Sequence, residues 1–325
     1  MITIGFSSHH LEALPYIRQQ MEGHQVIVLE EPPSPHLQAM LDGSISISDY
    51  IMEFDSGFPE FDRKMCALLQ ELHQAGAGII QVEPYLEKLL QIHELFAAGK
   101  TADEVSREPE FKSVYEAEKH ATGALLSYYA LSMEGPFAAV VDGVKDFARA
   151  DAERLTLRER LRARTISSLH KSNETMYVEA GYIHYPLYRY LRNELGAKQE
   201  IRVAYLLAPV IKKLQGKRRN MGPGDILTLH YAFHGRLKEE LANLLAARSL
   251  IYIKLIVKEE LIPDTCQTPH AEDEVKVNRL VDRLNFNQCR KLFEQIRLSK
   301  RTHAVEVAQE YVEREIGTNQ QAVDS

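Results

Sequence analysis

The chain has no tryptophan and only three cysteines among its 325 residues, namely Cys66, Cys266 and Cys289. No two of these cysteines stand at a CxxC or other ligand-like spacing, so the sequence supports neither a disulfide framework nor a cysteine zinc site. Sparse cysteine is typical of a reducing compartment, and we expect a cytoplasmic protein. The remaining composition, 45% apolar and 26% charged, is that of a folded globular chain.

The sequence has no excess of basic residues: 39 lysines and arginines face 46 aspartates and glutamates, a formal net charge of −7. A dedicated nucleic-acid-binding protein needs a basic face for phosphate contacts, so this balance argues against one. The most apolar stretch, residues 249–257, contains Lys254 and is far shorter than the roughly 20 residues that cross a bilayer. The N-terminal sequence MITIGFSSHH lacks a basic region and a long apolar region, so we expect no secretory signal and no membrane partner.

Several common enzyme signatures are also absent. The chain contains no GxxxxGKS/T phosphate loop, no GxSxG elbow and no HExxH motif, because His93-Glu94 lacks the second histidine. Gly76 and Gly78 precede their predicted strand instead of following it, which argues against a dinucleotide site. ATPase, lipase and zincin functions are therefore disfavoured.

Strand and helix patterns alternate from the N-terminus. Short apolar runs at 2–7 and 25–30 predict strands, and residues 11–21 between them carry apolar side chains at helical spacing. A connection of this length favours a parallel pair of strands, whose ligand-facing groups lie at the carboxyl ends. Residues 61–74 then predict a helix, and residues 78–82 predict a third strand.

The middle of the chain is predicted to be helical. Residues 101–172 show helical periodicity without a strand pattern, which predicts a large helical insertion. Strand patterns return at 175–180 and 201–207, with a helical pattern at 187–195 between them. We therefore expect a second strand, helix and strand unit.

These patterns predict an α/β fold in which duplicated βαβ units form a mainly parallel sheet. The core is expected over residues 1–210, including the insertion. Residues 211–325 should form a helical C-terminal region that packs on the core or extends it. Its helices are predicted at about 226–234, 236–259, 271–284, 286–298 and 303–316.

The two predicted βαβ units resemble each other in sequence. Gly5 in the first is followed by His9 and His10, and Gly181 in the second is followed by His184. Each unit then continues with a leucine- and tyrosine-containing helix, a glycine and a strand, which suggests an internal duplication. A glycine directly after a strand lets the backbone approach a ligand closely, so we place each glycine in the turn.

The predicted sheet gathers imidazole and carboxylate groups at the carboxyl ends of its strands. Such a set could hold a divalent transition metal that activates water. Alternatively, a histidine and a glutamate could share general acid and base work without a metal. The sequence leaves both chemistries open for His9 or His10, Glu30, Glu31, Glu83, Glu179 and His184.

Each candidate also has a structural interpretation. A histidine at a strand end is more often a hydrogen-bonded structural residue, and His9 or His10 could simply begin the following helix. Glu30 and Glu31 could be loop residues in solvent, and Glu83 could favour the positive end of the next helix. A solvated basic helix face or, alternatively, an anion site is predicted for Arg158, Arg160, Arg162 and Arg164.

Four motifs follow one another along the first two thirds of the chain: Gly5 with His9, Glu30 in Val-Ile-Val-Leu-Glu, Glu159-Arg160, and Gly181 with His184. Their order resembles the erythromycin esterase, ChaN and TraB/Tiki superfamily over roughly residues 1–210. The first motif reads GxxxH instead of GxxH, which leaves His10 as an alternative to His9. Leu161 stands where the family usually has Asp or Asn.

The resemblance implies a duplicated α/β fold whose members include hydrolases of macrolide esters or peptides, some of them metal-dependent. It implies catalytic or metal-binding roles for His9 and His184, a ligand or base role for Glu30, and charge stabilisation by Arg160. Our leading hypothesis is a hydrolase that activates water on an unidentified small-molecule or peptide substrate. Neighbouring binding groups would be Gly5, His10, Glu31, Glu83, Glu179 and Gly181.

The alternative hypothesis is a non-catalytic protein that keeps the fold and binds a ligand, a metal or a partner. The last predicted helix is amphipathic, and its apolar face could be buried against its own chain or against a second copy in a homo-oligomer. This face consists of Val305, Ala308, Tyr311, Val312 and Ile316.

Overall fold

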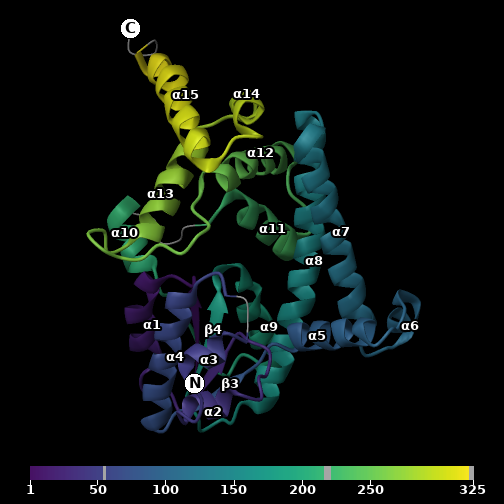
Figure 1. Cartoon of the computed structure of the whole chain (residues 1–325), viewed down its shortest axis with the longest axis vertical. Helices are drawn as coiled ribbons and strands as arrows, with labels where there is room; N and C mark the ends of the chain where they lie inside the picture. Colours follow the sequence, from purple (N-terminus) through teal and green to yellow (C-terminus); the bar gives the residue numbers. More distant parts are fainter. Residues whose placement is uncertain (54–55, 216–220, 322–325) are drawn as a thin grey trace. The chain divides into compact units, whose positions relative to one another are not determined.

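The computed structural model describes residues 1–53, 56–215 and 221–321, and the chain forms two compact units (Figure 1). The sheet unit contains Met1–Ala117, Arg154–Arg219 and Glu259–His270. The helical unit contains Glu118–Glu153, Asn220–Lys258 and Ala271–Ser325. The sequence predicted a boundary near residue 210, whereas the middle of the insertion belongs to the same unit as the C-terminal helices. Hydrophobic periodicity identifies the buried face of a helix but not the partner that covers it.

The sheet unit contains five parallel strands, which confirms the predicted α/β class. Their order across the sheet is β3-β2-β4-β1-β5. The central pair, β1 and β4, aligns Gly5 with Glu179 and Ser7 with Gly181. The strands are β1 (Ile2–Ser7), β2 (Val26–Leu29), β3 (Gly78–Gln81), β4 (Met176–Gly181) and β5 (Ile201–Tyr205).

The two predicted βαβ units are present and interleaved. The first is β1, the 3-10 helix η1 (Leu11–Ala13), α1 (Leu14–Met21) and β2. The second repeats this order with β4, η2 (Tyr182–His184), α9 (Pro186–Leu195) and β5. Because β4 lies between β1 and β2, and β1 lies between β4 and β5, each unit crosses over a strand of the other. The interleaving brings the corresponding ends of β1 and β4 side by side.

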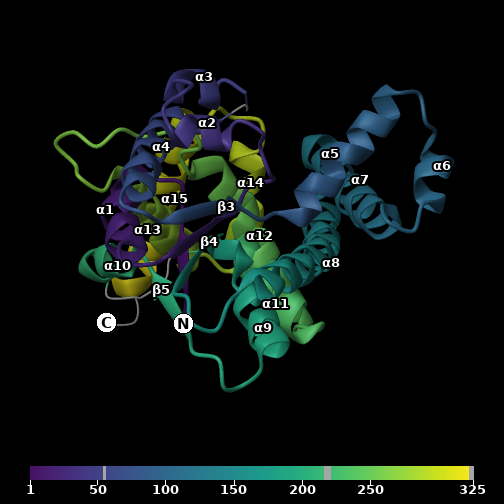
Figure 2. The same ribbon diagram turned by 90° about the horizontal axis from the view of Figure 1, so that it is seen from below.

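Helices cover both faces of this sheet (Figure 2). The strands alternate their side chains between the faces, and residues such as Ile4, Phe6 and Val178 form a buried cluster with Ala163 and Leu187. These last two residues come from α8 (Phe137–Leu169) and α9. On the other side lie α1 and α4 (Pro59–Gln74), whose apolar side chains recur at helical spacing as predicted.

The other helices of the sheet unit connect these layers. Between β2 and α4 the chain forms α2 (Leu37–Leu41) and α3 (Ile47–Ile51). After β3, Glu83 precedes α5 (Pro84–Ala97), where the proline occupies the first turn and needs no hydrogen-bond partner for a backbone N–H. The remaining helices are α6 (Ala102–Arg107) and α10 (Ala208–Gln215).

The predicted insertion contains two long helices, α7 (Lys112–Glu134) and α8, which run side by side and are separated by Gly135-Pro136 (Figure 1). The helical unit combines parts of this pair with the C-terminal helices. Those are α11 (Pro223–His234), α12 (Glu239–Leu255), α13 (Pro269–Asp282), α14 (Phe286–Ile296) and α15 (Arg301–Gln321). In the parts of the chain that the structure describes, no helix is both long enough and apolar enough to cross a membrane.

Two local expectations about the C-terminal region can be compared with the structure. The β-branched stretch around Ile251 is helical, as predicted, and is buried in the core of the helical unit. The helix expected at about 226–234 begins earlier than predicted, because α11 starts at Pro223 with Gly222 as its N-cap. Asp225 lies in the first turn, where its Oδ2 accepts the Gly222 N–H at 3.2 Å.

The apolar face of α15 is covered within its own unit. Ala308, Tyr311 and Val312 belong to the buried core, and Val305 packs against it. The side chain of Ile316 lies outside the described residues. The described part of this face therefore packs inside the chain. The homo-oligomer stays a prediction, and these four residues do not support it.

Candidate functional site

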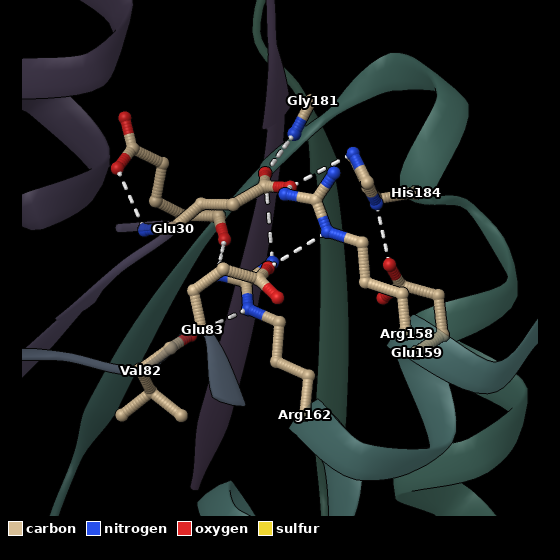
Figure 3. Close-up of polar contacts among 9 residues, drawn as sticks. Glu30, Val82, Glu83, Arg158, Glu159, Arg162, Gly181 and His184 are labelled. Carbon is tan, nitrogen blue, oxygen red and sulfur yellow. Dashed lines mark hydrogen bonds and ion pairs between the residues drawn. The ribbon is translucent and has the colours of Figure 1, made fainter. Parts of the chain in front are cut away.

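The candidate residues lie where neighbouring strands end. His9 and His10 follow β1, Glu30 and Glu31 follow β2, and Glu83 follows β3. From β4 and the turn after it come Glu179, Gly181 and His184. The side chains form two neighbouring groups. The ion-pair network comprises Glu30, Glu83, Arg158, Glu159, Arg162 and His184 (Figure 3), and the His9 cluster comprises His9, Glu31, Asp62 and Glu179.

His184 is held between two carboxylates. Its Nε2 lies 2.8 Å from Glu30 Oε1, and its Nδ1 contacts Glu159 Oε1. The imidazole donates from both nitrogens only when it is protonated. Burial by itself would lower the pKa of His184, but the charges of Glu30 and Glu159 raise it to about 9. At neutral pH this residue is therefore a buried cation.

Two arginines on α8 complete the network (Figure 3). Arg158 donates from Nη2 to Glu30 Oε1 at 3.1 Å and from Nε to Glu83 Oε2 at 2.9 Å. Arg162 is fully buried and donates to the backbone carbonyls of Val82 and Glu179. It also lies 3.5 Å from Glu30 Oε2. Arg162 thus connects the residue after β3 to β4, and Glu30, which follows the intervening strand β2, lies beside it.

The network has no net charge when all of its groups are ionised. Its three carboxylates then face two guanidinium groups and one imidazolium. Burial would raise the pKa of Glu30, but His184 and Arg162 hold it well below its ordinary value. Burial does raise the pKa of Glu83, because Arg158 only partly offsets it. Glu83 Oε1 and Glu159 Oε2 are buried without a hydrogen-bond partner among the described residues.

Gly181 permits the close approach of Glu30 and His184. Its N–H donates to Glu30 Oε2 at 2.7 Å. A Cβ at this position would lie only 3.3 Å from Cδ2 of His184. Gly181 ends β4, so it lies at the turn as expected.

The His9 cluster has a different electrostatic character. His9 is exposed, and its ring stacks on Phe61 with centroids 5.1 Å apart. Burial raises the pKa of Glu179 to about 7, an effect that His9 opposes and Glu31 reinforces. Burial likewise raises the pKa values of Glu31 and Asp62, and His9 opposes both shifts. One imidazole therefore lies within electrostatic reach of three carboxyl groups.

A small cavity adjoins this cluster. Its volume is about 20 Å³, and Glu31, Tyr50 and Asp62 are among its lining residues. That volume is sufficient for one water molecule, and these polar groups could bind it. Gln81 orients this wall, because its Nε2 donates to Glu31 Oε2 at 2.7 Å and contacts the Tyr50 hydroxyl at 3.0 Å.

Glu179 connects the two groups through the backbone. Its Oε2 accepts the Glu30 N–H at 3.2 Å, and its carbonyl accepts from Arg162. The side chain of Glu179 thus belongs to the His9 cluster, while its main chain is fixed by the network. Any rearrangement of the network would therefore move the carboxyl of Glu179.

Three predicted site residues lie elsewhere. Arg160 is exposed and its guanidinium lies 5.7 Å from the centroid of the Tyr190 ring. His10 is buried and stacks on His270 at 3.9 Å, and burial lowers its pKa to about 3. Gly5 lies inside β1, not in a turn as expected. A Cβ there would lie 2.0 Å from the Tyr177 hydroxyl.

Arg160 lies on a different face of α8 from the two arginines of the network. Successive residues of a helix are rotated by about 100°, so Arg160 points away from the side that carries Arg158 and Arg162. The sequence does contain a signal for the buried face. Two charged residues, Glu159 and Arg162, occupy positions in a stripe of α8 that is otherwise apolar. That stripe is Ala152, Leu155, Glu159, Arg162 and Ile166.

The predicted metal set does not fit this arrangement. Both ring nitrogens of His184 are engaged by carboxylates, and Glu30 faces two guanidinium groups. His9 stacks on Phe61 outside the network. Throughout the described ranges, no group of three or more His, Cys, Asp or Glu side chains is arranged to hold a metal ion. We therefore derive no chemistry from a metal at these residues.

Fold and site together define an α/β protein with a five-stranded parallel sheet and a polar cluster at its carboxyl edge. A protein of Archaeoglobus fulgidus, described as an uncharacterized protein, is 32% identical over 289 residues. The match covers 89% of this chain and 96% of the archaeal one, so the chain belongs to the same family. No protein-family model and no solved structure matches the chain.

Proposed function

We propose that the protein is a hydrolase in which Glu179 and His9 exchange protons with a water molecule and a substrate at the carboxyl edge of the sheet. The observation that carries this proposal is that three carboxyl groups lie within electrostatic reach of one exposed imidazole, and that two of them, Glu31 and Asp62, line a cavity of water size. The motif order that resembles the erythromycin esterase, ChaN and TraB/Tiki superfamily supports the same reaction class.

The proposed chemistry rests on the pKa of Glu179, which is about 7. A carboxyl with that pKa is present in both protonation states at neutral pH, as a general acid or base requires. Glu179 would take a proton from water as the water attacks a carbonyl carbon, and His9 would give a proton to the leaving group. The substrate would approach from the side of His9, which is exposed.

The ion-pair network would act on this reaction indirectly. His184 and Glu30 would be positioning residues, because their polar atoms are engaged with one another and with Gly181. Arg158 is 22% exposed, more than any other side chain of the network. It is therefore the cation best suited to the charge-stabilising role that the sequence suggested for Arg160.

The proposal predicts a large loss of activity in two single variants. With a panel of nitrophenyl esters and short peptides, Glu179→Gln and His9→Asn should each lower the hydrolysis rate by about 100- to 10,000-fold, as loss of general acid–base catalysis does. Arg160→Gln is the matched control, because Arg160 is exposed and lies on the other face of α8. Hydrolysis that survives both variants undiminished would contradict the proposal.

A second candidate is a non-catalytic ligand-binding protein that retains the fold. Two observations favour it. The cavity is small, about 20 Å³, and both ring nitrogens of His184 already contact carboxylates, so neither is available to a substrate. In that case the unmodified chain hydrolyses none of the esters or peptides. Glu179→Gln should then only raise the free energy of unfolding at pH 8, because it removes a buried charge.

A further inference from the structure

The helical unit contains a second cavity, which the proposed reaction does not use. Its volume is about 210 Å³. Its walls come from α7, α8, the start of α11 and the end of α12, and all of its lining residues belong to the helical unit. The residues that give it chemical character are Tyr128, Phe147, Asp151, Asp225, Ser249 and Tyr252.

The lining combines aromatic surfaces with carboxyl groups. Within the described ranges, no lysine, arginine or histidine contributes to the wall. Asp225 is fixed by the Gly222 N–H, which donates to its Oδ2 at 3.2 Å. Asp225 itself is exposed, and Asp151 lies in the same wall, so two carboxyl groups border the cavity. Such a wall repels anions and attracts a positive charge.

Two glycines line this cavity. A Cβ at Gly222 would lie 2.9 Å from Cε1 of Tyr252, so a larger residue there would force the Tyr252 ring or the start of α11 to shift. A Cβ at Gly224 would lie 3.5 Å from the Cβ of Ser249, an ordinary contact distance. A larger side chain at Gly224 or Ser249 would therefore project into the cavity space between the two helices.

We infer that this cavity binds a primary amine with an aromatic or similarly sized apolar body. An ammonium group would neutralise the carboxylate of Asp225 and interact favourably with the faces of the surrounding aromatic rings. An apolar cavity of about 150 Å³ is large enough for benzene, so 210 Å³ also accommodates a short aminoalkyl chain. The binding site is independent of the proposed hydrolase site.

Calorimetry with two probes of the same shape tests the inference. The full chain should bind phenethylamine at pH 7.5 at least tenfold more tightly than phenethyl alcohol, which carries no charge. Asp225→Asn should weaken phenethylamine binding at least tenfold and leave phenethyl alcohol unchanged. The asparagine oxygen can still accept the Gly222 N–H, so the start of α11 is preserved. His9→Asn should leave both affinities unchanged.

Filling the cavity provides a test of position. Ser249→Leu should abolish binding of both probes, and Gly224→Leu, which fills the same space from the opposite helix, provides a second variant if the first does not fold. Equal affinity for the amine and the alcohol would overturn the inference. So would an unchanged phenethylamine affinity in Asp225→Asn, or binding that persists in a folded cavity-filled variant.

Discussion

The ion-pair network and the His9 cluster lie at the same edge of one sheet, yet they handle buried charge in opposite ways. In the network, the three carboxylates face three cations, and the pKa of His184 is raised to about 9. In the His9 cluster, three carboxyl groups lie within electrostatic reach of a single exposed imidazole, and the pKa of each carboxyl is raised. Paired buried charges fix structure, whereas unpaired ones with shifted pKa values are available for chemistry.

The largest expected effect is on the free energy of unfolding, and it compares an arginine of the network with an exposed arginine of the same helix, α8. Arg162→Met would leave Glu30 with less compensation and two backbone carbonyls without their donor, so it should lower the free energy of unfolding by about 3 to 5 kcal/mol. Arg160→Met, two residues away and exposed, should change it by less than about 1 kcal/mol. Urea denaturation of both variants measures the difference. Equal losses would mean that Arg162 has no special structural role.

The second prediction uses pH to distinguish the two groups. A raised pKa means that the folded state holds its proton more tightly, so the stabilisation is present at low pH and is lost as pH rises. For His184 the loss should run from about pH 6.5 through about pH 9 and amount to roughly 3 kcal/mol. For Glu179 it should run from about pH 4.5 through about pH 7.

Denaturation curves at pH 4.5, 7 and 9.5 provide the measurement for these two windows. His184→Gln should remove the upper part of the pH dependence and leave the lower part intact. Glu179→Gln should do the reverse. If either variant removed both parts, the two groups would titrate as one and the comparison above would fail.

The smallest expected effect concerns the space beside His184. In Gly181→Ala the new methyl group would lie 3.3 Å from the His184 ring, so the ring must shift and the free energy of unfolding should fall by about 1 to 2 kcal/mol. Gly123→Ala, in the middle of α7 with no neighbouring atom within 4 Å, should instead raise it by up to about 1 kcal/mol. Thermal unfolding of the two variants checks the opposite signs. A stabilised Gly181→Ala variant would contradict the close packing described here.

Local sequence patterns predicted the strands and the residues at their ends. The run Ile2–Ser7 is apolar and β-rich, and the structure assigns β1 to the same residues. The parallel arrangement followed from the long connection between β1 and β2. The apolar run at 25–30 also predicted where β2 ends, and so predicted that Glu30 and Glu31 lie at the carboxyl edge of the sheet.

The remaining features depended on contacts between distant segments. Gly5 was expected in a turn, because no local pattern shows that β4 pairs with β1 and brings Tyr177 over it. Arg162 was assigned to a solvated basic face or an anion site, because an arginine at a buried helix position is rare unless it is paired. Its partners, Glu30 and the ends of β3 and β4, lie up to 132 positions away in the sequence.

The interleaved topology has a consequence for how the chain acquires its structure. The first strand, Ile2–Ser7, hydrogen-bonds only to Met176–Gly181 and Ile201–Tyr205 within the described sheet. A ribosome must therefore synthesise the chain as far as β4 before β1 can pair. Neither repeat could be excised or transplanted as a self-contained module, since each supplies the neighbour that the other requires.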